Sequence, residues 1–417
     1  MSKEPVNSIK YLDQESAPMP PKVYFGSVQH GVKKKFASFA AKVDRVVELL
    51  DLSSIEKEDK VVVKMHLGNG DGYQTIPVFF IRRIVKAIKE AGGWPFITDS
   101  PTAVYNAADR GYTQETCGCP IIPITGVKDG YVVKTPVEYG PVDKVSLAGV
   151  LHDADVLFDV THVKGHNSCG FGGAIKNLAL GGFAAETRWK KIHGIFSSIP
   201  FWDANRCTPE HAEKLVASCP YQIIKYDREE HKLSINFNGC YNQNCWECMK
   251  ADQEFGSLNL TQEHFSAFNE LMAVTSKQVV DTFSEDKRFY LSFLLQITPT
   301  CDCWGIGQPN IVNDIGVLGS RDIVAIETAA LDLIAKEGLI EKNIPPFMKH
   351  VNLEPNVDLH PFQRLQGPMK NPYLSPNYLE KIGGGSRDYE LIEVLSPEET
   401  MTSPPPQRVT EKAPTFF

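Results

Sequence analysis

The chain has 417 residues, of which 42% are hydrophobic, and its 43 Lys and Arg against 51 Asp and Glu give a formal net charge of -8. This composition is typical of a globular protein with two or three compact units, and it excludes a small disulfide-stapled scaffold. Because the sequence has no basic block and no run of roughly 18 to 20 apolar residues, we expect neither nucleic-acid binding nor a membrane span.

Strands and helices are expected to alternate through residues 23–199, the first part of an α/β domain that follows an N-terminal extension at 1–22. Apolar residues recur at helical spacing in some segments, whereas β-branched runs mark others as buried strands. In chain order, the expected elements are a strand at 23–28, a helix at 32–50, a strand at 60–66, a helix from Pro77 to Gly92, strands at 94–98 and 156–163, and a helix from Gly173 to Leu180. This alternation predicts an α/β fold with a mainly parallel sheet and flanking helices.

The character of the chain changes at residues 200–255, where cysteines are dense and no long periodic run occurs. We interpret this segment as a small ferredoxin-like insert that interrupts the sheet. Strands expected at 289–298 and 314–318 and a helix expected at 323–339 complete the α/β domain within residues 256–345. Residues 346–417 are expected to be irregular and to end in a proline-rich tail.

Four cysteines of the insert have the spacing of a metal site. Cys240, Cys245 and Cys248 form a C-x4-C-x2-C pattern, and Cys219 is followed by a proline. In bacterial ferredoxins, the cysteine before a proline ligates the cluster whose other ligands come from the other motif. The set therefore favours one 4Fe-4S cluster, with a β-hairpin at 223–237 between its ligands. A structural zinc site uses the same donors and is the alternative.

The remaining cysteines allow functional and structural interpretations. Cys301 and Cys303 follow an expected strand, and on an extended chain their side chains would point to opposite faces. In a loop they could form a ligand or redox pair, and otherwise they are ordinary buried thiols. We interpret Cys207 as the remnant of a second motif. We interpret Cys117, Cys119 and Cys169 as structural residues.

Charged and imidazole side chains follow three of the expected strands. The carboxyl ends of parallel strands lie at one edge of a sheet, where ligands bind. We therefore predict that these side chains line one crevice, where they bind an anionic group and supply protons. Taken singly, each histidine is also explained as a surface or core residue. The predicted catalytic residues are Lys64, His66, Asp99, His162, Lys164 and His166.

A glycine-rich segment, residues 165–182, follows the third of these strands. Backbone amides in such turns approach anions closely, and a helix that begins near Gly173 would point its positive end at one. The segment matches neither a Walker nor a dinucleotide-binding pattern. The predicted substrate-binding residues are Gly172, Gly173, Lys176 and Asn177, of which the last two could instead lie on an ordinary helix surface.

The chain resembles a family known as domain of unknown function 362, often described as uncharacterised Fe-S centre proteins. The residues that carry the resemblance are KMHLGNG (64–70), GGWPFITDS (92–100), THVKGHNSCGFGGAIKNLALG (161–181), CDCWG (301–305), DIGVLGSRDIVAIETAALDLI (314–334) and GGGSRDYELIEV (383–394). The resemblance implies a ferredoxin module with two four-cysteine motifs before the CDC segment. Here the first motif is reduced to Cys207 and Cys219, and the second has no fourth cysteine, which supports one cluster.

The leading hypothesis is a cytoplasmic oxidoreductase without a signal peptide, in which one 4Fe-4S cluster passes low-potential electrons to a small anionic organic substrate or second cofactor in the crevice. One alternative is an electron carrier for a redox partner protein, with no substrate of its own. Another is a non-redox metal enzyme that contains structural zinc. The sequence also leaves open whether a flavin or a second metal is bound, although no sequence pattern requires either.

Overall fold

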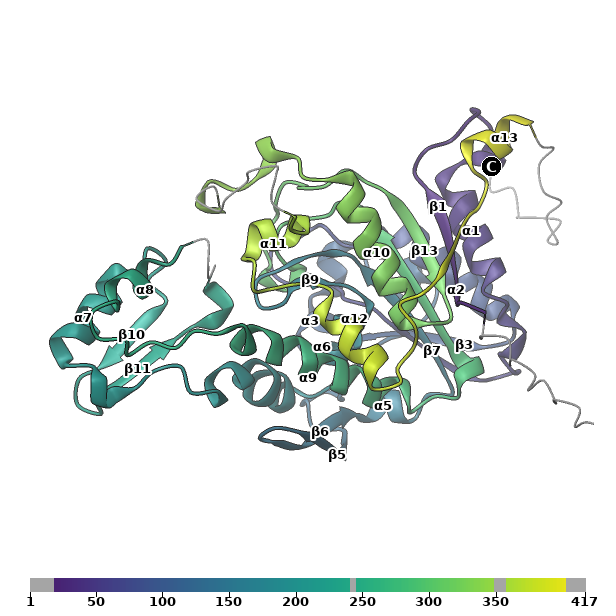
Figure 1. Ribbon diagram of the computed structural model, residues 1–417. Helices are drawn as coiled ribbons and strands as arrows, with labels where there is room; N and C mark the ends of the chain where they lie inside the picture. The colour runs from purple at the N-terminus through teal and green to yellow at the C-terminus, as the bar shows by residue number, and fades with distance from the viewer. Residues whose placement is uncertain (1–18, 241–244, 349–357, 403–417) are drawn as a thin grey trace, which may run out of the picture.

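The computed structural model describes residues 19–240, 245–348 and 358–402 of the chain, and Figure 1 shows their arrangement. An eight-stranded sheet crosses the main body in the order β14-β1-β13-β12-β7-β2-β3-β4. Neighbouring strands are parallel from β12 to β4, whereas β13 runs antiparallel to both of its neighbours. The predicted α/β fold with a mainly parallel sheet and flanking helices is therefore confirmed.

The strands of this sheet are β1 (Lys22–Ser27), β2 (Lys60–Lys64), β3 (Trp94–Asp99), β4 (Ile121–Pro123), β7 (Val156–His162), β12 (Arg288–Leu294), β13 (Gly316–Ser320) and β14 (Glu390–Glu393). All seven residues of β7 are buried, as expected for a central parallel strand that is covered on both faces. Successive side chains of β2 alternate between two apolar cores. Val61 and Val63 join one core, and Val62 joins the other.

Helices cover both faces of the sheet. Helices α1 (Phe39–Leu49) and α2 (Val78–Glu90) contribute to the core that contains Val61 and Val63. Helices α6 (Ala174–Gly181), α9 (Gln262–Val280) and α10 (Ile323–Glu337) contribute to the core on the opposite face. The shorter helices are α3 (Pro101–Tyr105), α4 (Gln114–Cys117), α5 (Gly149–His152), α11 (Pro361–Gln366), α12 (Leu374–Lys381) and α13 (Pro397–Thr402).

Several elements differ from the sequence prediction. Helix α1 begins later than the expected residue 32, because the Ser38 side chain accepts a hydrogen bond from the Ala41 amide and caps the helix there. The expected irregular C-terminal segment contains α11 and α12. Helix α9 was not expected, since buried polar residues such as Asn269 and Ser276 interrupt its apolar stripe. Small paired strands not predicted from the sequence are β5 (Val132–Tyr139), β6 (Val142–Ala148), β8 (Lys164–His166) and β9 (Gly170–Gly172).

The cysteine-rich segment forms a module that extends from the main body on the left of Figure 1. It contains α7 (Pro209–Ser218), the hairpin of β10 (Ile224–Asp227) and β11 (Lys232–Ile235), and α8 (Glu247–Ala251). The chain enters and leaves this module side by side, since the Asp203 amide donates to the Ser257 carbonyl at 2.8 Å. The hairpin lies within the predicted 223–237.

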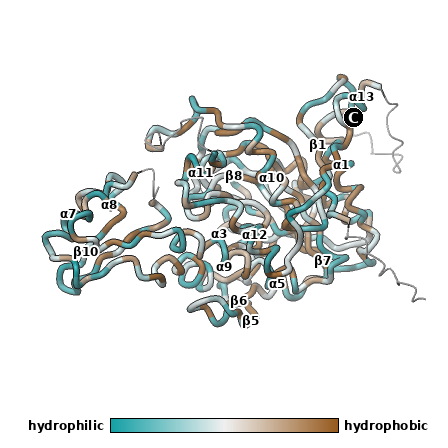
Figure 2. Tube along the Cα trace, viewed as in Figure 1, coloured by the Kyte–Doolittle hydropathy of each residue, from teal (hydrophilic) through white to brown (hydrophobic). Residues whose placement is uncertain are grey.

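Hydrophilic and hydrophobic residues alternate along most of the trace, as Figure 2 shows. Within the described residues, none of the helices is both long enough and apolar enough to span a bilayer.

Candidate functional site

A cleft of about 450 Å³ lies where the parallel strands end. Strands β2, β3 and β7 end at Lys64, Asp99 and His162, and their parallel pairing brings these ends to one edge of the sheet. All predicted catalytic and substrate-binding residues except His162 line this cleft, namely Lys64, His66, Asp99, Lys164, His166, Gly172, Gly173, Lys176 and Asn177.

Asp99 is the centre of a buried network at the ends of β2 and β3. Its carboxylate lies 3.3 Å from Lys64 Nζ and 2.9 Å from His66 Nδ1, and it accepts a hydrogen bond from the Leu67 amide at 3.0 Å. Burial alone would raise the pKa of Asp99, but the charges of Lys64 and His66 outweigh burial and lower it. The carboxylate therefore stays ionised and fixes the orientation of the His66 ring.

His162 does not line the cleft but contacts the turn that carries Cys301 and Cys303. Its Nδ1 lies 3.0 Å from Asp302 Oδ2, and its Nε2 lies 2.8 Å from the Leu295 carbonyl oxygen. Lys164 Nζ lies 3.1 Å from the same Asp302 oxygen. Burial would raise the pKa of Asp302, but Lys164 and His162 lower it to about 2. The two predicted catalytic residues therefore act together as positioning groups for this turn.

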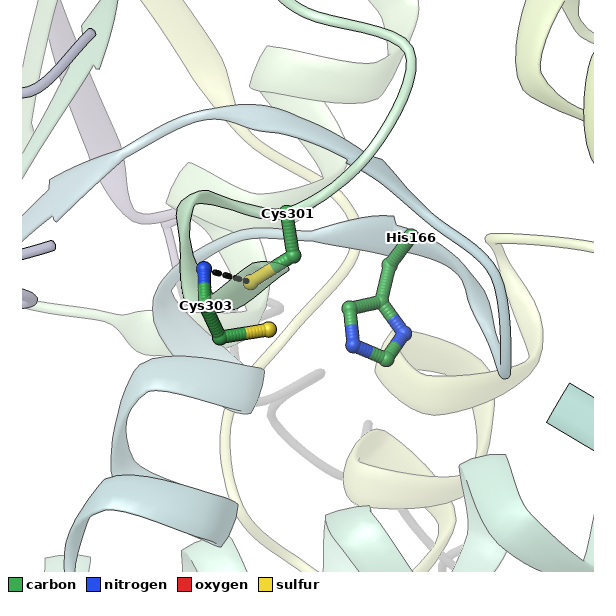
Figure 3. Close-up of side chains that lie close together, drawn as sticks. All are labelled: His166, Cys301 and Cys303. Carbon is green, nitrogen blue, oxygen red and sulfur yellow. Dashed lines mark hydrogen bonds between the residues drawn. The ribbon is translucent and has the colours of Figure 1, made fainter. Parts of the chain in front are cut away.

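The Cys301–Cys303 turn brings two sulfur atoms to one side of the backbone. A short 3-10 turn at Asp302–Trp304 bends the chain, and the Cys303 amide donates to Cys301 Sγ at 3.4 Å. One ring nitrogen of His166 faces both sulfur atoms in Figure 3. The ligand atoms of these three residues all lie within 4.8 Å of one another, so the group could hold a metal ion. The turn is the reason why the alternation expected of a strand does not apply here.

The Cys301 thiol lies in surroundings that favour its ionised form. The hydrogen bond from the Cys303 side chain is the main cause that lowers its pKa well below the ordinary value. Burial opposes this effect, and Lys176, whose Nζ lies 3.5 Å from the sulfur, adds to it. A thiolate is the form of cysteine that binds metals and attacks electrophiles. Burial and the Lys176 charge also lower the pKa of His166 to about 3, which keeps its imidazole neutral.

The glycine-rich segment is packed tightly against α10. A side chain at Gly173 would place its Cβ 2.3 Å from Glu327 Oε2, and that oxygen accepts a hydrogen bond from the Ile175 amide at 3.4 Å. The first turn of α6 therefore already faces a carboxyl group of the chain itself. Lys176 and Asn177 do not lie on an ordinary helix surface, because Lys176 faces Cys301 and Asn177 Oδ1 accepts from Lys64 Nζ at 3.0 Å.

Another wall of the cleft was not predicted from the sequence. A π-helical segment at Glu186–Ile192 carries Arg188 and Trp189, and His193 follows it. Arg188 Nε is buried and has no hydrogen-bond partner among the described residues. Trp189 is 64% exposed and stacks on the His193 ring with 4.8 Å between centroids. Short π-helical segments often occur at functional sites, but they have no periodic sequence pattern that would reveal them.

The four predicted cluster ligands lie together in the module. Cys219, Cys240, Cys245 and Cys248 line one small hollow, whose other walls are mainly apolar and include Ile224, Ile235 and Phe265. Burial, together with the neighbouring cysteines, raises the pKa of Cys248 to about 12. Four cysteine thiols suit a thiolate-ligated cluster or a zinc ion, but among the described residues only the ligand atoms of His166, Cys301 and Cys303 all lie within 4.8 Å of one another. The intervening residues 241–244 lie outside the described part of the chain.

The other cysteines are buried at separate positions. Cys117 and Cys119 belong to the core that is formed with α1 and α2. Cys207 is buried and faces the Thr208 carbonyl, and it does not line the module's hollow. Cys169 borders the cleft group instead, since its Sγ lies 3.3 Å from His166 Nδ1.

The protein combines an α/β fold, a strand-end cleft with a Cys/His group, and a module that contains four cysteines. Over residues 61–332 the chain matches the family described as domain of unknown function (DUF362). This match covers more than half of the chain, which therefore belongs to that family, as its sequence resemblance implied. No functionally curated protein matches the chain.

Two solved structures are remotely similar to this protein. The lactate racemase apoprotein from Thermoanaerobacterium thermosaccharolyticum is 13% identical over 76% of this chain, with a TM-score of 0.33. A protein from Thermotoga maritima is 10% identical over 64% of the chain, with a TM-score of 0.32. The alignments cover 58% and 52% of those two chains. Similarity at this level carries no functional argument.

Proposed function

We propose that this protein is an iron-sulfur oxidoreductase that reduces a small organic anion bound in the strand-end cleft. Cys219, Cys240, Cys245 and Cys248 would hold a single 4Fe-4S cluster, which supplies low-potential one-electron transfer when bound. Each electron would come from an external low-potential donor, which is oxidised as the bound anion is reduced. Protons would enter from the solvent through the cleft.

The main support is that the cysteine module and the cleft share a wall. Asn238, only two residues before Cys240, lines the cleft. Its side chain accepts a hydrogen bond from Ser168 Oγ and lies 3.3 Å from His193 Nδ1. Redox groups held by this module would therefore lie close to a ligand in the cleft.

Arg188 favours an anionic ligand in the cleft, because the three lysines of the cleft already face anionic or sulfur partners. Lys64 is paired with Asp99, Lys164 with Asp302, and Lys176 with the Cys301 sulfur. Arg188 adds a cation whose Nε has no partner among the described residues. Its guanidinium can donate two parallel hydrogen bonds to a carboxylate or a phosphate. The exposed Trp189 beside it offers an apolar face for the rest of the ligand.

The size of the cleft favours an enzyme over an electron carrier that has no substrate. Ligand sites for small molecules usually have volumes of roughly 300 to 1,000 Å³, and this cleft has about 450 Å³. An electron carrier needs only a cluster close to its surface, so it gains nothing from buried lysines at the ends of three strands.

Metal and sulfide analysis of protein purified without oxygen tests this proposal. We expect about four iron and four sulfide per chain, together with an absorption that dithionite bleaches. Replacing Cys240 and Cys248 by serine should remove both elements, whereas Cys117→Ser should retain them. Zinc without sulfide in the wild-type protein would contradict the proposal and would favour the structural-zinc alternative.

A further inference from the structure

We propose that His66 completes a second metal centre, in which His66, His166, Cys301 and Cys303 bind a divalent ion such as zinc at the edge of the cleft. This centre would be separate from the four cysteines of the module. Two imidazoles and two thiolates form a donor set that zinc binds with tetrahedral geometry. The proposal does not depend on whether the module contains iron or zinc.

The first support is the unused nitrogen of His66. Its Nδ1 faces the Asp99 carboxylate at 2.9 Å, so Nε2 is the nitrogen that could bind a metal ion. This Nε2 is buried and makes no hydrogen bond with the described residues. His66 lines the same cleft as His166 and Cys303. A carboxylate that orients a ligating histidine through its other nitrogen is the usual arrangement around protein-bound zinc.

The second support is the orientation of His166. Its Nδ1 is turned toward the Ser168 amide at 3.2 Å and the Cys169 sulfur at 3.3 Å, and its other nitrogen faces the sulfurs of Cys301 and Cys303 (Figure 3). A metal on Nε2 requires the proton to lie on Nδ1, where Cys169 Sγ is the available acceptor. The Ser168 amide would lose its present contact. Cys169 therefore becomes a positioning residue for this centre.

The third support is the charge balance of the group. Two ionised thiols carry the charge that neutralises a divalent cation, and Lys176 Nζ can continue to donate to Cys301 Sγ. His162 and Lys164 hold Asp302 between the two cysteines, which fixes the turn before any ion binds. A simple redox dithiol would not require the imidazole of His166 to face both sulfur atoms (Figure 3).

Cobalt titration of the full chain tests this centre without any measurement of activity. The background variant carries Cys→Ser changes at positions 219, 240, 245 and 248, so that only the cleft group retains thiolates of this kind. We expect one cobalt ion per chain and a near-ultraviolet sulfur-to-cobalt charge-transfer band. Adding Cys301→Ser and Cys303→Ser should abolish the band. Persistence of the band, or its absence from the background variant together with a Cys301–Cys303 disulfide, would overturn the proposal.

The role of His66 has its own matched comparison. His66→Ala should weaken cobalt binding by about 10-fold to 100-fold or more and change the visible spectrum, because a nitrogen ligand is lost. His193→Ala, which removes another imidazole of the cleft, should leave binding unchanged. Equal affinities and spectra in His66→Ala and wild type would overturn the assignment of His66. If the background variant does not fold, the same comparison uses zinc content in the otherwise wild-type chain, where iron and sulfide should stay constant.

Discussion

The Cys301–Cys303 turn and the four-cysteine module both gather sulfur atoms, but their surroundings differ. At the turn, Lys176 lies 3.5 Å from Cys301 Sγ, and hydrogen bonding lowers the pKa of that thiol. In the module, the hollow is mainly apolar, and burial raises the pKa of Cys248 to about 12. The turn can therefore hold a thiolate by itself, whereas Cys248 needs a bound metal to ionise near neutral pH.

The two regions also differ in how the fold holds them. The turn is anchored to the ends of buried strands through Asp302, His162 and Lys164. The module is a small unit that joins the main body through paired segments near Asp203 and Ser257. We infer that a bound metal centre contributes more to the folding of the module than to the folding of the turn.

The largest expected effect is the loss of the module when its ligands are removed. Replacing Cys219 and Cys248 by serine should abolish iron binding and expose residues 204–256 to protease, while the main body stays folded. In small metal sites, the binding free energy, of order 10 kcal/mol, is largely folding free energy. Limited proteolysis with mass spectrometry measures this difference. Cys207→Ser is the matched control, and equal cleavage rates in the two variants would refute the role of the metal.

A smaller effect is expected at the turn. Asp302→Asn removes the charge partner of His162 and Lys164, whose side chains are almost completely buried. Breaking a buried ion pair costs about 3 to 5 kcal/mol, so the urea midpoint of the whole main body should fall. Asp143→Asn, at an exposed position, should leave the midpoint unchanged. A normal midpoint in Asp302→Asn would show that the turn does not depend on this network.

Crowding beside the cleft gives a third test. Gly173→Ala places a Cβ against Glu327 and Phe171, and overpacking of this kind costs about 1 to 3 kcal/mol. Urea unfolding measures the change. Gly194→Ala is the matched control, since the nearest atom to its new Cβ is 3.6 Å away. Equal stability of the two variants would mean that α6 can shift to accommodate the methyl group.

Glu327 and Asp302 should affect the pH dependence of stability in opposite ways, because the pKa of Asp302 is lowered and that of Glu327 is raised. Both carboxyl groups are buried, but burial without a paired cation raises the pKa of Glu327 to about 8. Because this folded-state pKa exceeds the unfolded value, the contribution of Glu327 is present below about pH 4.5 and is lost as the pH rises toward 8. The loss is at most about 1.4 kcal/mol per pH unit.

Urea unfolding at pH 6 and pH 8.5 measures this dependence. The wild-type protein should lose stability between these two values, and Glu327→Gln should lose less. The exposed variant Glu90→Gln should follow the wild type. A slope in Glu327→Gln as steep as in the wild type would assign the pH dependence to other groups.

The strand-end part of the site could be predicted from the sequence because local patterns specify it. The β-branched residues before Lys64 identify a buried strand, and parallel pairing then places Lys64, Asp99 and Lys164 at one edge. The sequence could not place Arg188, because a π-helical segment leaves no periodic pattern. The proximity of Cys301 to His166 depends on how the turn at Cys301 packs against the rest of the fold. The spacing of residues in the sequence does not reveal that packing.

X-ray absorption at the iron and zinc edges of the anaerobically purified protein tests most directly whether the chain holds two separate metal centres. We predict that iron is surrounded by sulfur with neighbouring iron atoms, from the module cysteines, and that zinc has both sulfur and nitrogen ligands, from the cleft group. The zinc signal should disappear in the Cys301→Ser and Cys303→Ser double variant while the iron signal stays unchanged. If the protein contained no iron and its zinc were bound by sulfur alone, both proposed metal centres would be contradicted.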